Sequence, residues 1–225
     1  ELTLIYSGFL FSVIGVDTTG KIVRELLRKS KIIDKLITDK KRTTTLKIRI
    51  FSGSKYLLRL DQEVKRPVPR TVTIKLLEQI SEKIHSFDAI VFSDYDKGVL
   101  NASIIEKIIQ LTTRLKIPTV VDPKKRNFLF YKNVTLFKPN LKELREGLKV
   151  DVDGADGEQI SKAVIQLKEK LNASGVMITL SEHGVYIDDT EKLKLPAHTR
   201  EIADVSGAGD TVISVAALCV ALKLA

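Results

Sequence analysis

Short apolar runs alternate with amphipathic stretches along most of this chain, which predicts strands and helices in turn. Apolar residues spaced three and four apart predict helices, whereas short continuous apolar runs predict buried strands. The last apolar run, which extends to the end of the chain, predicts a helix that begins at Gly207. The other expected helices cover 21–29, 71–85, 102–115 and 157–171, with a short one from about 140, and the expected strands cover 89–92, 118–121, 176–180 and 185–187.

Residues 44–60 show the other periodicity, an alternation of apolar and polar residues. Two such runs are separated by Ser52-Gly53-Ser54. Alternation on both sides of a glycine-containing turn predicts a β-hairpin.

The order strand, helix, strand predicts an α/β fold with a mostly parallel sheet that helices cover on both faces. In such sheets ligands bind beyond the carboxyl ends of the strands. Polar residues follow three of the apolar runs, namely Ser93-Asp94, Asp122 and Asn140. We therefore expect the functional site at this edge. No repeat or linker divides residues 1–225, so a single domain is expected.

The amino-acid composition indicates the class of protein and its cellular compartment. The chain has 225 residues, 44% of them hydrophobic and 29% charged, as is ordinary for a globular protein. Its single cysteine, Cys219, lies in an apolar helical stretch, which predicts a buried thiol, no internal disulfide and a reducing, cytoplasmic location. The apolar segment 2–16 is too short to cross a bilayer and has no basic leader, so no membrane association is expected.

The formal net charge of +9 raises the question of nucleic-acid binding. The basic residues are scattered, and no aromatic residues that could stack on bases interleave with the two short clusters at 40–42 and 124–126. The charge therefore indicates small anionic substrates rather than a nucleic acid.

The segment Gly207-Ala208-Gly209-Asp210 is the strongest chemical motif. The first turn of a helix leaves amide groups unpaired and carries a partial positive charge, so a phosphate can bind there. A carboxylate beside that phosphate could accept the proton of an approaching hydroxyl. Such an arrangement suits phosphoryl transfer. The alternative is a tight turn in which the glycines meet only steric demands.

Two further motifs each allow two interpretations. In 93–98, Lys97 could neutralise a substrate phosphate and Asp94 could accept a hydrogen bond from a sugar hydroxyl, or the segment could be a simple turn. Asn140 and Glu143 lie three apart at a helix start. Glu143 could hold Mg²⁺ through its water shell, but the spacing alone favours a capping box between the two residues.

Segments 179–184 and 151–157 complete the candidates. The backbone and hydroxyls of Thr179 and Ser181 could surround a nucleotide phosphate, although a plain hairpin explains the segment equally well. The acidic residues of 151–157 lack the ligand order of a calcium loop, because Ala155 and Asp156 occupy its fifth and sixth positions. We interpret this segment as the acidic entry to a helix.

Taken together, these motifs resemble the ribokinase-type (PfkB) carbohydrate kinase family. The broad-family motif is 207–210, and the order and spacing of the motifs agree from Val13 onward. The hairpin and the segments 93–100, 121–124 and 138–143 most resemble the branch that phosphorylates C1 of D-glycero-β-D-manno-heptose 7-phosphate, the kinase domain of ADP-heptose synthases in lipopolysaccharide-core biosynthesis. The resemblance implies a ribokinase-like three-layer sandwich with the hairpin at 44–60 as a small β lid.

The resemblance also implies roles for individual residues. Asp210 would be the base, and Gly207, Ala208 and Gly209 would form the anion hole. The ATP and Mg²⁺ site would include Asn140, Leu141, Lys142 and Glu143, with Glu143 at the metal, while Thr179, Ser181 and Gly184 would lie along the nucleotide. Lys97, with Arg49 and Arg59, would meet the sugar phosphate. The lid pairs subunits in many relatives, so a homodimer is expected.

Several segments that the family normally carries are not found in residues 1–225. The early Asp, the Gly-Gly and Asn segment that grips the sugar, and the sequence that encloses adenine are not found, and 2–12 does not fit the family. We expect a partial kinase domain, incomplete at both ends, without a fused nucleotidyltransferase domain. The alternatives are another sugar or hexose-phosphate kinase of the family and a non-catalytic nucleotide- or nucleic-acid-binding module.

Overall fold

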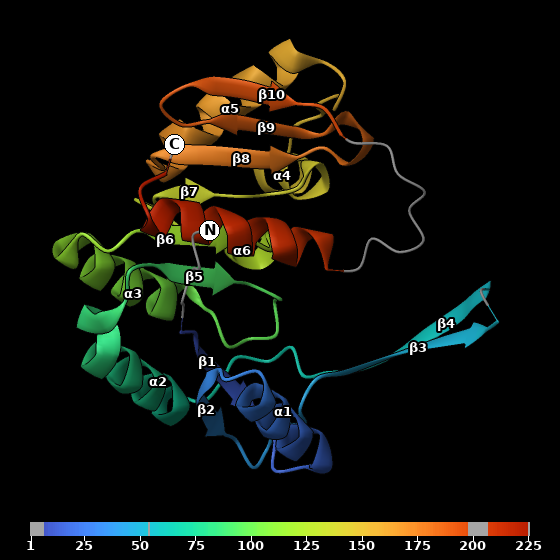
Figure 1. The fold of residues 1–225 in the computed structure, drawn as a ribbon, viewed down its shortest axis with the longest axis vertical. Coiled ribbons are helices and arrows are strands. Elements are labelled where there is room, and N and C mark those ends of the chain that lie inside the picture. Colours follow the sequence, from blue (N-terminus) through green and yellow to red (C-terminus); the bar gives the residue numbers. More distant parts are fainter. Residues whose placement is uncertain (1–6, 54, 198–206, 225) are drawn as a thin grey trace, which may run out of the picture. The chain divides into compact units, whose positions relative to one another are not determined.

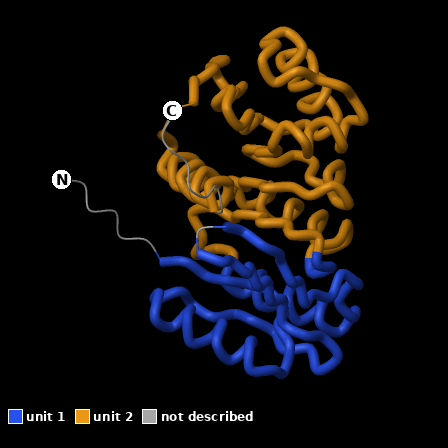
Figure 2. Tube along the Cα trace, turned by 90° about the vertical axis from the view of Figure 1, so that its right-hand side faces the viewer, with its two compact units in different colours: residues 1–83, 97–99 blue, residues 84–96, 100–225 orange. Residues whose placement is uncertain are grey.

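A computed structural model describes residues 7–53, 55–197 and 207–224. The chain forms two compact units, the first made of 1–83 with 97–99 and the second of 84–96 with 100–225 (Figure 2). Because 97–99 returns to the first unit, the boundary is crossed more than once and no linker marks it in the sequence.

The first unit is built on a parallel pair of strands, β1 (Phe9–Ile14) and β2 (Ile33–Thr38). Helix α1 (Thr18–Lys29) connects them and places Leu27 against Ile14 and Leu36. Helix α2 (Arg70–Lys83) also contacts both strands. The sequence analysis predicted neither strand: β1 lies within the apolar segment 2–16, and β2 carries Asp34 and Lys35 and lacks a continuous apolar run.

Polar contacts join the α1 turn to the start of the hairpin. The Asp17 carboxylate caps α1 by accepting from the Gly20 amide at 2.7 Å, and it accepts from the Thr44 amide at 2.7 Å. Arg42 is buried and donates to the carbonyl groups of Val64, Lys97 and Arg66 at 3.0, 2.8 and 2.7 Å. Burial lowers the pKa of Arg42. Arg42 therefore holds backbone together and is not part of an exposed basic cluster.

The hairpin is confirmed, with β3 (Leu46–Ser52) antiparallel to β4 (Lys55–Gln62). Ile48 lies opposite Leu60, and Ile50 opposite Leu58. All four side chains are exposed, with exposed fractions between 37% and 54%. Two strands without a covering layer leave apolar surface in contact with water.

The second unit contains a six-stranded sheet in the order β10-β9-β8-β7-β6-β5 (Figure 1). The sheet pairs β5 to β8 in parallel and adds β9 and β10 antiparallel to their neighbours. The strands are β5 (Ile90–Ser93), β6 (Thr119–Asp122), β7 (Leu136–Phe137), β8 (Gly175–Thr179), β9 (Val185–Asp188) and β10 (Lys192–Leu195). The alternating Lys-Leu-Lys-Leu of β10 was not among the expected strands.

Helices cover both faces of this sheet. Helix α6 (Ala208–Ala221) packs Ile213, Ala216 and Ala217 against Val120 and Leu136. Phe137, the residue after Leu136, points to the opposite face, where its ring meets Phe128 and Tyr131 at centroid distances of 5.1 and 6.3 Å. Helices α4 (Leu141–Leu148) and α5 (Gly157–Leu171) lie behind the sheet and α6 lies in front of it (Figure 1). The predicted three-layer α/β sandwich is confirmed.

Local sequence signals set several helix ends. Helices α3 (Ala102–Leu115) and α5 have the predicted bounds, and the side chains of Asn101 and Asp156 cap their first turns. Short 3-10 helices cover Ile84–Ser86, Lys125–Asn127 and Ser181–His183.

Cys219 is half-buried in α6 rather than fully buried, because that face of the helix is only partly covered. Among the described helices, none is long and apolar enough to cross a membrane.

Candidate active site

The carboxyl ends of β5 to β8 lie at one edge of the sheet, and the predicted polar residues follow them. Tyr95 comes two residues after β5, Asp122 ends β6, Lys138 directly follows β7, and Thr179 ends β8. Helix α6 begins at the same edge: a Cβ added to Gly209 would lie 3.9 Å from the Lys138 ammonium nitrogen. The site is therefore contained in the second unit.

The start of α6 combines a conformational requirement with an open approach. Gly207 precedes the helix with φ +83°, in the left-handed region that favours glycine, and its N-cap position supplies no side-chain hydrogen bond to the first turn. At Gly209 the nearest atom to an added Cβ is the Lys138 nitrogen at an ordinary contact distance. The left-handed backbone conformation therefore explains the glycine at 207. At 209, no close contact with a described residue requires a glycine.

Asp210 is the third residue of α6, and its exposed side chain is held by a hydrogen bond from Tyr95. The Tyr95 hydroxyl donates to Asp210 Oδ1 at 2.8 Å. Burial raises the pKa of Tyr95, and the hydrogen bond to Asp210 raises it further. The phenol therefore stays protonated at neutral pH, as a donor must.

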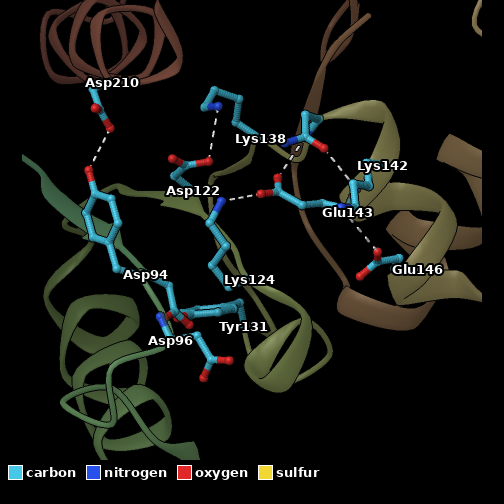
Figure 3. Close-up of polar contacts among 12 residues, drawn as sticks. Asp94, Asp96, Asp122, Lys124, Tyr131, Lys138, Lys142, Glu143, Glu146 and Asp210 are labelled. Atoms are coloured by element: carbon cyan, nitrogen blue, oxygen red, sulfur yellow. Dashed lines mark hydrogen bonds and ion pairs between the residues drawn. The ribbon is translucent and has the colours of Figure 1, made fainter. Parts of the chain in front are cut away.

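Two ion pairs lie beside this helix start (Figure 3). Lys138 Nζ lies 3.1 Å from Asp122 Oδ1, and Lys124 pairs with Glu143. Burial raises the pKa of Asp122, although Lys138 and Lys124 oppose the shift. Burial alone would lower the pKa of Lys124, but its hydrogen bond to Glu143 raises it above the ordinary value. Two buried carboxylates are thus balanced by two ammonium groups.

Glu143 also completes a capping box at the start of α4. The Asn140 side chain accepts from the Glu143 amide at 2.8 Å, and Glu143 Oε2 accepts from the Asn140 amide at 2.9 Å. The capping box that the spacing favoured is present. With Lys124 on its other oxygen, Glu143 would meet a magnesium ion through the ion's waters, the mode in which Mg²⁺ usually binds. Among the described residues, no three His, Cys, Asp or Glu side chains gather as a metal site.

The start of α4 and the turn after β8 are neighbours. Asn140 and Thr179 form a parallel bridge, and the Thr179 amide donates to the Pro139 carbonyl at 3.2 Å. Leu141 and His183 both approach Gly154, at 2.8 and 3.0 Å from an added Cβ. The structure thus brings together the two predicted nucleotide segments, 140–143 and 179–184.

The turn between β8 and β9 is tight. Ser181 adopts φ +53° and Gly184 φ +85°, and a Cβ at Gly184 would lie 1.9 Å from the Leu195 carbonyl oxygen. Glycine at 184 is therefore a packing requirement.

The predicted nucleotide residue Lys142 lies in the first turn of α4, where its ammonium group pairs with the Glu146 carboxylate at 4.0 Å.

Asp94 is buried in the interior rather than open to a ligand. It is 3% exposed, and its carboxylate accepts from Asn127 Nδ2 and the Tyr131 hydroxyl, both at 2.8 Å, and from the Asp96 amide at 2.7 Å. In the structure Asp94 therefore holds the loop after β5, and its contact with a sugar hydroxyl stays a prediction.

The other predicted substrate residues belong to the first unit. Lys97 Nζ pairs with Glu63 at 2.7 Å, and Arg59 pairs with Asp61 at 2.9 Å. Arg49 lies directly opposite Arg59 in the hairpin. Two guanidinium groups on adjacent strands give the hairpin a cationic pair, and their role toward a sugar phosphate stays a prediction.

Sequence reasoning did not assign site roles to Tyr95, Asp122, Lys124 or Lys138. Asp122 marked a strand end, and all four lie in the motif segments 93–100, 121–124 and 138–143. The strand-end rule could have included them, but only the folded sheet shows which of these side chains turn toward Asp210 and Glu143.

Solved structures confirm the fold. Phosphofructokinase-2 from Escherichia coli, crystallised with fructose-6-phosphate, has a TM-score of 0.77 at 18% identity over 97% of this chain and 71% of that chain. Ribokinase from Giardia lamblia has a TM-score of 0.71 at 20% identity over 94% of this chain and 65% of its own. The fold is thus ribokinase-like.

The profile described as pfkB family carbohydrate kinase matches residues 4–223. The chain belongs to this family. Because the match begins at residue 4, the expectation that 2–12 falls outside the family pattern is wrong for most of that segment. ATP is accordingly the expected co-substrate of a kinase of this class.

Curated relatives are closer in sequence. Proteins named bifunctional protein HldE are 39% identical in Campylobacter jejuni, over 96% of this chain and 45% of the relative, and 36% identical in Helicobacter pylori, over 92% and 44%. The chain therefore spans less than half the length of the curated relatives it matches.

Proposed function

We propose that this chain transfers the γ-phosphoryl group of ATP to a hydroxyl of a sugar phosphate, namely C1 of D-glycero-β-D-manno-heptose 7-phosphate. The observation that carries the proposal is the position of Asp210. Its carboxylate lies in the first turn of α6, directly beside amide groups that no N-cap side chain occupies. The HldE relatives and the motifs that resemble the heptose branch support the choice of sugar.

The reaction needs a base and a site for negative charge. The Oδ2 atom of Asp210 accepts the proton of the sugar hydroxyl as its oxygen bonds to the γ-phosphorus, and the bond from that phosphorus to the β-phosphate oxygen breaks, releasing ADP. The amides of Ala208 and Gly209, at the positive end of the helix dipole, stabilise charge on the transferred group. Among the described residues outside the helix backbone, only the Lys138 ammonium nitrogen lies within 4 Å of a Cβ built at Gly209, so a phosphate can approach the backbone there.

The nucleotide lies, in this proposal, along 140–143 and 179–184, which the structure brings together. Glu143 is the residue that would hold Mg²⁺ through the ion's water shell, and a bound ion would supply positive charge beside the phosphates. By the family resemblance alone, Lys97, Arg49 and Arg59 are the candidates for binding the phosphate of the sugar.

A test is ADP release by the full-length protein with a panel of sugar phosphates. We expect turnover with heptose 7-phosphate and little with fructose 6-phosphate. Preference for fructose 6-phosphate would contradict the heptose assignment and favour another sugar kinase of the family. ATP binding without turnover on any sugar would contradict the kinase proposal itself.

We also propose that the protein is a homodimer joined through the hairpin. The support is the exposed apolar set Ile48, Ile50, Leu58 and Leu60 on two strands that no other described element covers. Light scattering of the intact protein should give twice the monomer mass, and I50D with L58D should give the monomer. A monomeric unmodified protein would contradict this proposal.

A further inference from the structure

The contact between Tyr95 and Asp210 joins the loop after β5 to the first turn of α6. The hydroxyl of Tyr95 donates to Oδ1 of Asp210 at 2.8 Å. Tyr95 is 51% exposed and Asp210 is also exposed. Both groups are therefore at the surface where a substrate would arrive, rather than in the packed core.

The residues on both sides of Tyr95 are fixed by other contacts. Asp94, directly before it, is buried and accepts hydrogen bonds from Asn127 and Tyr131. Asp96, directly after it, donates its amide to Asp94 at 2.7 Å and adopts φ +54°. The placement of Tyr95 thus rests on a buried network.

Two more contacts tie this loop to the neighbouring strand and helix. The Asp94 amide donates to the Asp122 carbonyl at 3.0 Å, so the loop leaves β5 in register with β6. Arg126 Nε lies 2.9 Å from Asp96 Oδ1. The residues on both sides of Tyr95 are therefore held by contacts that do not involve Asp210.

A carboxylate that acts as a base uses one oxygen and must be oriented. A donor on Oδ1 stabilises the ionised carboxylate, restricts its rotation and leaves Oδ2 for the incoming hydroxyl. The phenol can do this without adding a charge to the site. An ammonium group in the same place would add a positive charge that makes the carboxylate a weaker base.

We propose that Tyr95 is a positioning residue for the base of the kinase reaction, which holds the Asp210 carboxylate by its Oδ1 atom so that Oδ2 meets the sugar hydroxyl. The inference rests on the proposed function, in which Asp210 is that base. Tyr95 acts through Asp210 and makes no contact of its own with the reacting atoms.

The first test compares Y95F with Y186F in the full-length protein. Both variants remove one phenol hydroxyl, and Tyr186 lies in β9 opposite Ile178, outside the segments assigned to the site. We expect Y95F to lower kcat about tenfold, as loss of a hydrogen bond to a charged group does, with KM for ATP unchanged. Y186F should retain the kcat of the unmodified protein. An unchanged kcat in Y95F would overturn the inference.

A double-mutant cycle separates positioning from direct contact with the substrate. If Tyr95 acts through Asp210, D210N with Y95F has the same residual kcat as D210N alone. A further tenfold loss in the double variant would overturn the positioning role, because Tyr95 would then act on the substrate itself.

A spectroscopic measurement tests the contact without any turnover. Burial and the carboxylates of Asp210 and Asp122 raise the pKa of Tyr95, and the Ser93 hydroxyl opposes them. In D210N the titration of Tyr95 should move to lower pH, measured as phenolate absorbance with Y95F as the reference. An unmoved titration would overturn the contact, whereas absence of turnover in the unmodified protein would overturn only the proposed function.

Discussion

Lys138 places its ammonium nitrogen 3.1 Å from the Asp122 carboxylate, and the side chains are 3% and 12% exposed. The pair joins the ends of two adjacent parallel strands directly beside the first turn of α6. A charge this well buried is tolerated only with a partner, because its desolvation costs several kcal/mol.

Removal of the cation should therefore destabilise the second unit. We expect K138M to lower the free energy of unfolding by about 3–5 kcal/mol, because Asp122 is left buried and unpaired. Urea denaturation measures this change. D122N with K138M is the matched control and should recover part of the loss, since no uncompensated charge remains.

The pH dependence of K138M follows from the raised pKa of Asp122. A carboxyl whose pKa is higher in the folded state binds protons more readily when folded, so its effect on stability becomes unfavourable as pH rises through the folded pKa. Without Lys138 that pKa rises further. The stability deficit of K138M should be largest at neutral pH and should shrink in acid. A deficit that does not change with pH would contradict the account.

Substitution of the two glycines at the start of α6 distinguishes an anion hole from a tight turn. G207A forces a left-handed alanine and should cost about 1–2 kcal/mol of stability. G209A meets only an ordinary contact, and alanine favours helix, so its stability should be equal to that of the unmodified protein or higher by up to about 1 kcal/mol. If phosphate binds there, G209A nevertheless lowers kcat. Full activity in G209A would contradict the anion hole.

Replacement of the proposed base gives the most direct kinetic prediction. D210N should lower kcat by at least about 10²-fold, the lower bound for a positioned base. Because the loss of one charge near the helix start costs only about 0.3–1 kcal/mol, the variant should stay folded and bind ATP. Equilibrium dialysis and ADP release measure the two effects. Near-normal turnover would rule out this role.

The two halves of the capping box separate the metal role from the structural role. E143Q keeps a side chain that can cap but leaves Lys124 without its ion pair, so it should lower stability and also raise the Mg²⁺ concentration required for activity. N140A removes the N-cap and should cost about 1 kcal/mol of stability with an unchanged Mg²⁺ requirement. Equal Mg²⁺ titration curves for both variants and the unmodified protein would leave Glu143 a capping residue only.

Periodicity predicted the elements whose signals are local. Helices α3 and α5 were predicted with their observed bounds, since Asn101 and Asp156 are good N-caps and the apolar spacing is regular. Strand β2 was missed because Asp34 and Lys35 interrupt its apolar run, and β1 lies within the apolar segment 2–16, which has no turn signal to mark a strand. Both interpretations of Asn140 and Glu143 were compatible with the spacing, and the structure shows the capping box.

The sequence alone determined the order of elements, the edge of the sheet that carries polar residues, and the importance of 207–210. These properties follow from local periodicity and from the direction of parallel strands, so they can be derived without coordinates. Only the tertiary structure decided that Tyr95 meets Asp210, that Lys138 pairs with Asp122 and that Asp94 faces inward. Those contacts join residues far apart in the sequence, from strand ends, loops and helix α6, and their geometry depends on how these elements pack together.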